Sequence, residues 1–230
     1  MKFEKTEVWG FEHAIRGMRN PMNSWDKSDS DWKFVEDPAI INPNDEVKFV
    51  MGKNDMKLAQ KLILSGSEHR KFMRQIFVSV DITAPMYWWS EFDTYKVGTV
   101  ANSTSKMHKL ATTPITIDCF ENDDCQHRFA PTELNEFIEG LENLRQQYLE
   151  TKNKGYWKEL IRWLPESWLQ KRTVTMNYEN LLAMCSKGQR RLHKLNEWSG
   201  QDHPDLPNFI SWARSLPYAQ ELIFIDEVVG

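Results

Sequence analysis

The alternation of apolar and polar positions predicts short strands separated by amphipathic helices. Residues 2–9 and 76–82 alternate with a period of two, as in a strand with one buried face. Residues 54–66, 131–148 and 156–164 place apolar side chains every three or four positions, as on one face of a helix. We therefore expect an α+β fold in which a mixed sheet packs against helices.

Capping residues and turn signals set the expected boundaries of these elements. Asn54 or Asp55 is the expected N-cap of the first amphipathic helix, and Thr132 that of the longest one. Short extended segments are expected at 46–50 and 113–120.

Two further helices are predicted in the second half of the chain. Residues 173–185 predict a helix that contains Asn177. The last 22 residues predict a helix, a turn at Pro217 and a closing extended piece.

Composition and charge narrow the class of protein. The chain has 230 residues with 40% hydrophobic and 12% aromatic side chains, which excludes disorder and predicts a single domain over 1–230. Its net charge of −4 argues against a duplex nucleic-acid partner. No apolar run approaches the about 18 residues that span a bilayer, and the first residues lack a signal peptide, so we expect no membrane partner.

The cysteines predict a reducing compartment and no metal centre. Cys119, Cys125 and Cys185 are odd in number and lack paired metal-ligand spacing, which is typical of free thiols in the cytoplasm. Cys125 and His127 could begin a metal site, but no second pair follows, so we expect a structural or surface role for them.

Two polar segments follow near the N-terminus. Residues 10–25 are predicted to be part helix, broken by Gly17 and the turn signal Asn20-Pro21. They contain several donors and aromatic side chains, and are either a ligand lid or ordinary surface. Residues 26–44 are charged and contain Pro and Asn, which predicts a loop, and a mobile one.

The stretch 84–110 combines an aromatic helix with a polar segment. Pro85 is expected to open a helix on which Trp88 and Trp89 are buried. After Gly98, residues 99–106 are rich in hydroxyls and short amides and end in a lysine, a composition suited to holding phosphate. The alternative is a buried helix followed by a polar loop without ligand.

This stretch resembles the flavin-dependent thymidylate synthases. In that family an Ala-Pro-led helix runs into Arg-His-Arg-x-x-Ser-x-Asn-Glu-x-Ser-x-Arg-Tyr, and Asn102 and Ser105 match the Asn and the second Ser. The Arg-His-Arg falls on residues 95–97, or on 94–96 with one insertion, and so becomes Tyr-Lys-Val or Thr-Tyr-Lys. The family's Glu becomes Ser103, and its closing Arg-Tyr becomes Met-His at 107–108.

A second stretch resembles the same family in the same order. The family has an Arg before Leu-Pro, an Asn on a helix, then an Arg, a His and a Gln-Trp-Glu segment. This chain has, in that order, Arg162, Leu164-Pro165, Asn177, Arg190-Arg191, His193 and Asn196-Glu197-Trp198. The family's second Asn falls on Ala183, which is a departure.

The resemblance implies a set of site residues. The implied flavin contacts are Lys96, Asn102, Asn177 and His69, the last of which is otherwise an exposed helical histidine. The implied nucleotide contacts are Glu91, Ser103, Ser105, Lys106, Arg162 and Arg191. No protein nucleophile is implied and no catalytic residue is assigned, because reduced flavin and substrate supply the reactive atoms.

The resemblance also implies cofactors, reactants and an assembly. These are FAD, a uridine nucleotide, methylenetetrahydrofolate, the reductant NADPH, and a homotetramer whose interfaces build the sites. Ten Trp in 230 residues also favour an oligomer, because aromatic side chains are enriched at interfaces.

Three functions remain open from the sequence. The chain is a nucleotide-modifying flavoenzyme, an inactive protein that binds or sequesters a nucleotide, or a scaffold that shares only the fold. If the chain has a pyrimidine cleft, we expect Arg162 and Arg191 to face one cavity with Asn177 and Ser105. Guanidinium groups on separate faces with no cavity between them would leave only the scaffold. We expect Arg191 rather than Arg190 to point inward, because it shares a helical face with Leu195.

Overall fold

The computed structural model describes residues 1–34, 47–124 and 130–228, and all structural statements concern these ranges. Its centre is a four-stranded sheet in the order β1-β4-β6-β5. The strands are β1 (Lys2–Trp9), β4 (Phe77–Pro85), β5 (Val100–Ser103) and β6 (Leu169–Asn177). Each strand pair in this sheet is antiparallel, so the sheet is antiparallel rather than mixed, while the α+β class is confirmed.

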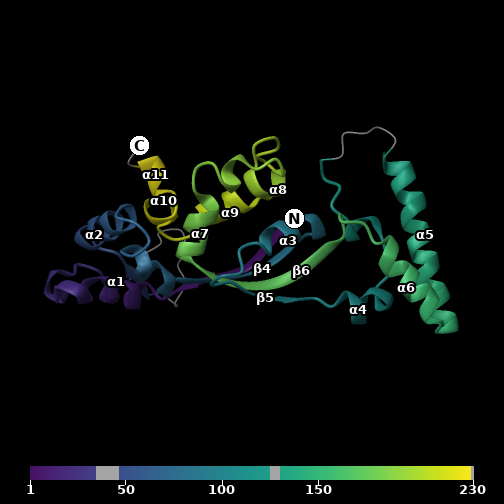
Figure 1. Ribbon diagram of the computed structural model, residues 1–230, viewed down its shortest axis with the longest axis horizontal. Helices are drawn as coiled ribbons and strands as arrows, with labels where there is room; N and C mark the ends of the chain where they lie inside the picture. Colours follow the sequence, from purple (N-terminus) through teal and green to yellow (C-terminus); the bar gives the residue numbers. More distant parts are fainter. Residues whose placement is uncertain (35–46, 125–129, 229–230) are drawn as a thin grey trace.

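Helices cover one face and both ends of this sheet (Figure 1). The helices of five or more residues are α1 (Phe11–Arg19), α2 (Lys53–Leu64), α3 (Met86–Phe92), α5 (Ala130–Thr151), α6 (Lys154–Trp163), α7 (Tyr178–Cys185) and α9 (Phe209–Arg214). The four-residue helices are α4 (Lys106–Lys109), α8 (Asn196–Ser199), α10 (Ala219–Leu222) and α11 (Ile225–Val228). Short 3-10 turns are η1 (Asn20–Met22), η2 (Trp25–Lys27), η3 (Arg70–Gln75), η4 (Leu110–Thr112), η5 (Ile117–Cys119) and η6 (Arg190–Leu192).

The central strand β4 buries one face, as its alternation predicts. Val78, Val80 and Ile82 of β4 are completely buried, whereas Ser79 and Asp81 between them are half-exposed. Trp88 and Trp89 of α3 are also completely buried, and the Trp88 ring stacks on that of Trp198 at 4.5 Å. Burial of large apolar side chains stabilises the fold by about 1.5–3 kcal/mol each.

A second apolar cluster lies apart from this core, between the α5–α6 hairpin and the segment 110–120. Its buried members are Leu110, Ile115, Phe120, Ile138, Leu141 and Leu160. Arg145 and Glu142 connect the same two parts, because Arg145 donates to the Ala111 carbonyl at 3.0 Å and Glu142 accepts from the Ile115 amide at 2.8 Å.

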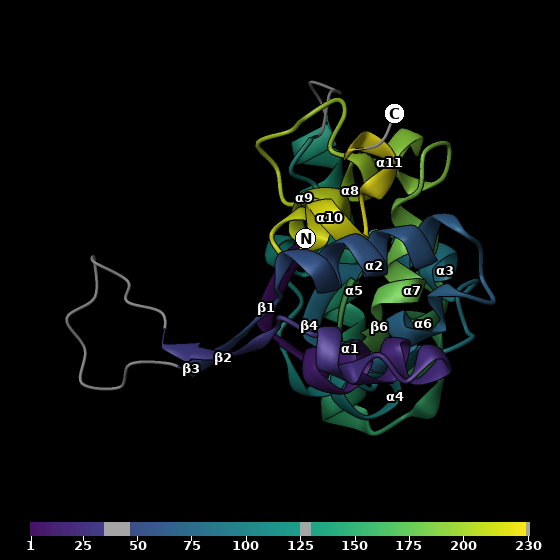
Figure 2. The ribbon, with the colours of Figure 1, turned by 90° about the vertical axis from the view of Figure 1, so that its left-hand side faces the viewer.

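The strands β2 (Asp31–Phe34) and β3 (Val47–Val50) form a separate antiparallel pair, which we call the arm. The arm projects from the body of the molecule beside β1 and α1 (Figure 2). Asp55 fixes its base by accepting from Arg19 Nε at 2.6 Å, from the Ser28 and Ser30 hydroxyls at 2.7 Å each, and from two backbone amides.

Several predicted boundaries are wrong. Lys53 begins α2, so Asn54 and Asp55 lie in its first turn, and the side chain of Asp29 caps their amides at 2.9 and 3.0 Å. Likewise α5 begins at Ala130, so Thr132 lies inside the helix. The predicted loop at 26–44 contains η2 and strand β2; its residues 35–44, together with Glu46, lie outside the described residues.

Three predicted segments have a different secondary structure. Residues 113–120 form η5 and a single bridge from Phe120 to Trp168 rather than a strand. Residues 173–177 belong to strand β6, and the helix begins only at Tyr178. The end of the chain forms α10 and α11 instead of an extended piece, because Leu222, Ile223 and Phe224 are buried together in the main core.

Candidate functional site

The loop 93–99, between α3 and β5, is held against the N-terminus of α7. The Asn180 side chain donates from Nδ2 to the Val97 carbonyl at 2.7 Å. A Cβ on Gly98, whose φ is +80°, would lie 3.0 Å from both Asn177 Nδ2 and Asn180 Oδ1. Asn177 and Asn180 also exchange side chain–backbone bonds of 3.0 and 3.1 Å. Asn177 therefore caps α7 and contacts the loop that carries Lys96.

Arg190, and not Arg191, points inward toward this loop. Arg190 is 9% exposed and donates from NH1 to Glu91 Oε2 at 2.9 Å and from Nε to the Tyr95 hydroxyl at 3.1 Å. Its guanidinium lies 4.6 Å from the centroid of the Trp198 ring. The predicted orientation is wrong because residues 190–192 form a 3-10 turn, in which the α-helical spacing used for the prediction does not hold.

Arg191 points toward α11 instead of this loop. It donates to the carboxylates of Asp226 and Glu227 on α11. Arg162 is exposed on α6, at the other end of the molecule from α11 (Figure 1). The expected common cavity of Arg162 and Arg191 is therefore absent from the described part of a single chain.

A second guanidinium near the loop belongs to Arg172, which the sequence analysis missed. Arg172 donates from NH1 to Asp93 at 2.8 Å, and its guanidinium carbon lies 4.2 Å from the centroid of the Trp89 ring. The period-two pattern of Gln170, Val174 and Met176 places Arg172 on the helix-covered face, and this alternation was the available signal.

His69 precedes η3, whose arginines contact the first turn of α7. Arg70 Nε donates to Glu179 at 3.2 Å, and Arg74 donates to the same carboxylate. Burial raises the pKa of the Glu179 carboxyl, but the bonds from Arg74 and Arg70 outweigh it and hold this pKa below its usual value. His69 itself is exposed.

The predicted phosphate segment runs along the β5 edge of the sheet. Asn102 and Ser103 are exposed on β5, and Lys106 is half-exposed in α4. The Ser105 hydroxyl accepts from the His108 amide at 3.3 Å and thereby caps α4. Gln170 Nε2 donates to the Thr104 carbonyl at 2.9 Å, so the segment is fixed to β6.

A polar hollow of about 380 Å³ lies beside α8, in the Asn196-Glu197-Trp198 segment. Tyr87 donates its hydroxyl to Glu197. Burial, followed by this bond to a carboxylate, raises the pKa of the Tyr87 hydroxyl above its usual value. Asn196 is buried and exchanges two bonds of 2.9 and 3.1 Å with the His203 backbone, so it orders the loop that closes the hollow.

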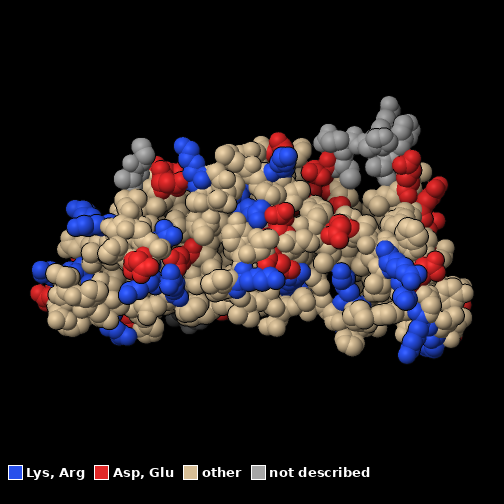
Figure 3. All heavy atoms as spheres, in the orientation of Figure 1, with Lys and Arg blue, Asp and Glu red and all other residues tan. Residues whose placement is uncertain are grey.

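The cysteines, charges and helices add little to this site. Cys119 and Cys185 are free thiols, whereas Cys125 and His127 lie outside the described residues. Basic and acidic side chains are interspersed over the described part of the face in Figure 3. Among the helices of the described ranges, none has both the length and the apolar character needed to cross a membrane.

Comparison with known proteins gives no match by sequence and a full-length match by structure. No protein-family model matches the chain, and no curated protein does. The flavin-dependent thymidylate synthase ThyX of Helicobacter pylori, solved with FAD and dUMP, superposes with a TM-score of 0.65 at 17% identity, over 98% of this chain and 99% of that one. Another structure of ThyX from this organism with FAD and dUMP gives 0.63 at 15% identity over 100% of both chains. The chain has the fold of the flavin-dependent thymidylate synthases.

Proposed function

We propose that this protein is a flavin-dependent enzyme that modifies a pyrimidine nucleotide, in the manner of a thymidylate synthase. One observation carries the proposal: the fold matches, over its whole length, that of enzymes solved with FAD and dUMP. The reaction that we infer is the reductive methylation of a uridine nucleotide or a related change to the pyrimidine ring.

The grouping of residues around the N-terminus of α7 supports this proposal. Asn177 lies at that terminus and Lys96 on the adjoining loop, while Glu91 is paired with Arg190 beside it. His69 adjoins Arg70, which holds Glu179 in the first turn of the same helix. Amide, imidazole and ammonium donors in one region are suited to a phosphate-bearing cofactor.

A phosphate of FAD fits the ammonium group of Lys96 better than it fits the guanidinium groups nearby. Arg190 and Arg172 are paired with Glu91 and Asp93, whereas Lys96 is exposed and has no ion pair in the described part of the chain. We assign FAD to Lys96, Asn102, Asn177 and His69, where, once reduced by NADPH, it would carry the electrons for the reaction. These residues would bind and orient FAD. Lys96 would do so as a point charge, because a lysine cannot make the bidentate contact of a guanidinium group.

The separation of Arg162 from Arg191 is compatible with the proposal only if subunits share the site. We infer a homotetramer in which the Arg162 of one chain approaches the nucleotide bound by another, with Ser103, Ser105 and Lys106 on its phosphate. NADPH and methylenetetrahydrofolate complete the inferred reaction as reductant and carbon donor, and we place it in the cytoplasm.

Absorption of the purified protein tests the proposal directly. We expect a yellow protein with the flavin absorbance bands, or quenching of flavin fluorescence on titration with FAD. A matched titration with dUMP, followed by calorimetry, tests the nucleotide. If neither FAD nor dUMP binds at a ligand concentration of about 1 mM, the proposal is contradicted and only the likeness in fold remains.

A second candidate is a nucleotide-binding protein without catalysis. The pairing of Arg190 and Arg172 with carboxylates favours it, because guanidinium groups tied within the chain are less available for a flavin pyrophosphate. Binding of dUMP without binding of FAD would select this candidate over the enzyme.

A further inference from the structure

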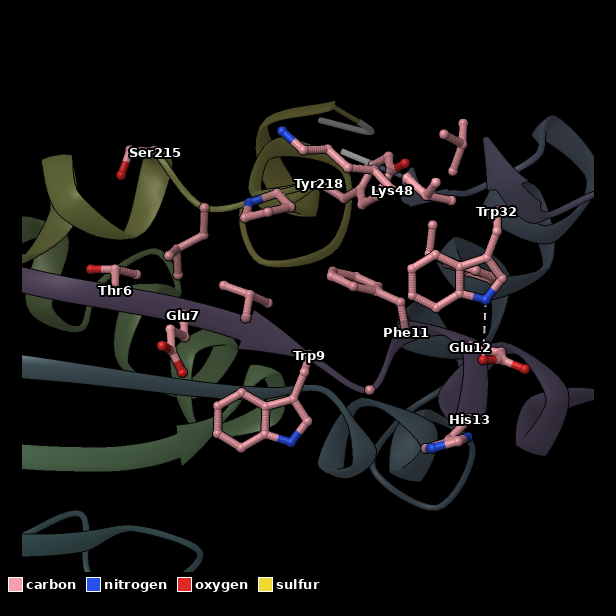
Figure 4. A pocket seen from close by; sticks show the side chains of 17 residues that line it. Thr6, Glu7, Trp9, Phe11, Glu12, His13, Trp32, Lys48, Ser215 and Tyr218 are labelled. Atoms are coloured by element: carbon pink, nitrogen blue, oxygen red, sulfur yellow. Dashed lines mark hydrogen bonds between the residues drawn. The ribbon is translucent and has the colours of Figure 1, made fainter. Parts of the chain in front are cut away.

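A large groove beside β1 favours neither an acidic nor a basic partner. It has a volume of about 1290 Å³ and lies between residues 6–13, the arm strand β3 and residues 215–218. Its lining carries both signs of charge, because Glu7, Glu12 and Lys48 all belong to it (Figure 4). The α5–α6 hairpin, by contrast, separates the two signs onto different helices.

The solvent-facing side of α5 is acidic. Its exposed charged side chains are those of Glu133, Glu136, Glu139 and Glu150. The basic residue of this helix, Arg145, is buried and paired with Glu142. The first three glutamates lie near the beginning of the helix and have no ion pair within the described residues. A partner of positive charge therefore suits this part of α5.

The solvent-facing side of α6 is basic. Lys154, Lys158 and Arg162 are four residues apart, so they form a row along one side of the helix. All three are exposed, and none has an ion pair in the ranges that the structure describes. Glu159, the acidic residue of α6, points about 100° away from Lys158 around the helix axis. Figure 3 shows acidic side chains where α5 begins and basic side chains lower down the hairpin. A second copy of the hairpin offers both the cations that suit α5 and the carboxylates that suit α6.

Aromatic side chains and one glycine face solvent on the same hairpin. Trp163 of α6 is 59% exposed and Phe137 of α5 is 38% exposed. Gly140 lies inside α5, where glycine destabilises a helix relative to alanine, yet a Cβ added to it would meet no described atom within 4 Å. The described part of the chain therefore gives no steric reason for this glycine, whereas the close approach of another backbone would.

The two charged rows lie at matching heights along the hairpin. α5 and α6 run antiparallel and are joined by a short turn, so Lys158 lies about level with Gln147 of α5 (Figure 1). Gln147 and Glu136 lie on opposite sides of Leu141, each about 8 Å from it along the helix. Lys158 and Glu136 are therefore about equally far from the level of Gly140 and Leu141, in opposite directions.

We propose that two copies of the chain pack their hairpins face to face, about a twofold axis that passes between α5 and α6 at the level of Gly140. This axis brings Glu136 of each copy to Lys158 of the other, and Glu133 to the level of Lys154. The exposed tryptophan of α6 lies at about the same level as the axis, so it is covered at the centre of the interface. One surface thus serves both chains.

The hairpin pairing goes beyond the proposed function and does not depend on whether flavin or nucleotide binds. Arg162 continues the row of lysines, so it also lies beside the second copy. It is left unaltered in the variants below because a nucleotide contact is proposed for it. A protein that pairs its hairpins but binds neither FAD nor dUMP would keep this inference and lose the proposed function, and the reverse result would do the opposite.

Light scattering of charge-reversal variants tests the pairing. Glu136→Lys and Lys158→Glu should each halve the molar mass at micromolar concentration, because like charges then meet on both sides of the axis. The double variant should regain the mass of the unaltered protein, since it restores the pair with the charges exchanged. Lys57→Glu, at an exposed position of α2, is the control and should leave the mass unchanged.

Circular dichroism shows whether each variant is folded. A monomeric unaltered chain, or folded single variants that keep its mass, would overturn the proposal. A double variant that stays dissociated would overturn it as well, because the two reversed positions would then not meet.

Carbodiimide crosslinking of the unaltered protein gives an independent measurement. The reagent joins a lysine amine to a glutamate carboxylate as an amide, with loss of water, where the two groups are in contact. We expect links between residues 154–158 and 133–136 in a product of two chains. Within one chain Lys158 and Glu136 differ by about 16 Å in height along the hairpin, which is too far for such a link. A two-chain product without these links, or no two-chain product, contradicts the pairing.

Discussion

Gly98 shows how one residue places the loop of the candidate site. Its φ of +80° is in the left-handed region, and its α-carbon lies against the side-chain amide groups of Asn177 and Asn180. Glycine alone satisfies both conditions, because any Cβ adds backbone strain and a contact of 3.0 Å. The path of the loop that carries Lys96 therefore depends on the absence of a side chain.

Replacing Gly98 with Ala should lower the free energy of unfolding by about 1–3 kcal/mol through this strain and crowding. Gly66→Ala is a matched control, because Gly66 has a φ of +107° but no atom within 4 Å of the added Cβ. Urea unfolding measures both variants. Equal losses would show that contact with the asparagines contributes nothing.

Lys106 tests the phosphate segment at the same scale. Lys106→Ala should weaken dUMP binding by about 1.5–3 kcal/mol, the range for a hydrogen bond to a charged group, with little change in folding. Lys57→Ala, at an exposed lysine on α2, is the control. Unchanged affinity in calorimetry would exclude Lys106 from the nucleotide site.

At the scale of elements, Asp55 joins α1, α2 and the base of the arm. Its carboxylate is completely buried and pairs with Arg19, which is 5% exposed. Burial raises the pKa of the Asp55 carboxyl, but bonds from Ser28, Ser30 and Arg19 together hold it below the usual value. Three elements therefore share one charged residue.

Asp55→Asn should destabilise the fold by about 3–5 kcal/mol, because the buried Arg19 charge loses its partner. Asp26→Asn, at an exposed position of η2, should change the stability by less than about 0.5 kcal/mol. Thermal and urea unfolding report both. A small loss for Asp55→Asn would mean that water enters and solvates Arg19.

Glu142 makes the stability of the α5–α6 hairpin depend on pH. Hydrogen bonds from Arg145 lower the pKa of the Glu142 carboxyl to about 2 from its ordinary 4.5. A lowered folded-state pKa stabilises the protein above the unfolded-state pKa, and this contribution is lost as pH falls from about 4.5 to about 2. The melting temperature of the Glu142→Gln variant should therefore fall less steeply than that of the unaltered protein as the pH is lowered over this interval. An identical dependence of melting temperature on pH would contradict this role of Glu142.

At the scale of the whole molecule, two apolar clusters divide the chain. The main core surrounds the sheet, and the smaller cluster lies under α5 and α6. Because fewer buried groups support the second cluster, it should open locally at lower free energy than the sheet. The molecule is therefore one fold with a less stable helical end.

Leu141→Ala tests this division. The loss of a side chain that is 1% exposed should cost about 2–5 kcal/mol. Hydrogen exchange should increase within 110–124 and 130–164, while amides of β4 keep their protection. Uniform acceleration throughout the described ranges would show instead that both clusters unfold as one unit.

The sequence by itself determined the strand at 2–9, most of strand β4 through the alternation at 76–82, and the three amphipathic helices, because a period of two or 3.6 reports a locally defined buried face. It also determined the α+β class. Two short motifs in the correct order, within 84–110 and 162–198, indicated the likeness to the fold of the flavin-dependent thymidylate synthases. Tertiary structure alone decided that Asp29 rather than Asn54 caps α2, and that Arg190 rather than Arg191 meets Glu91. The reason is physical: periodicity encodes which side of an element is buried, whereas a cap or an ion pair between distant residues depends on how the whole chain brings them together.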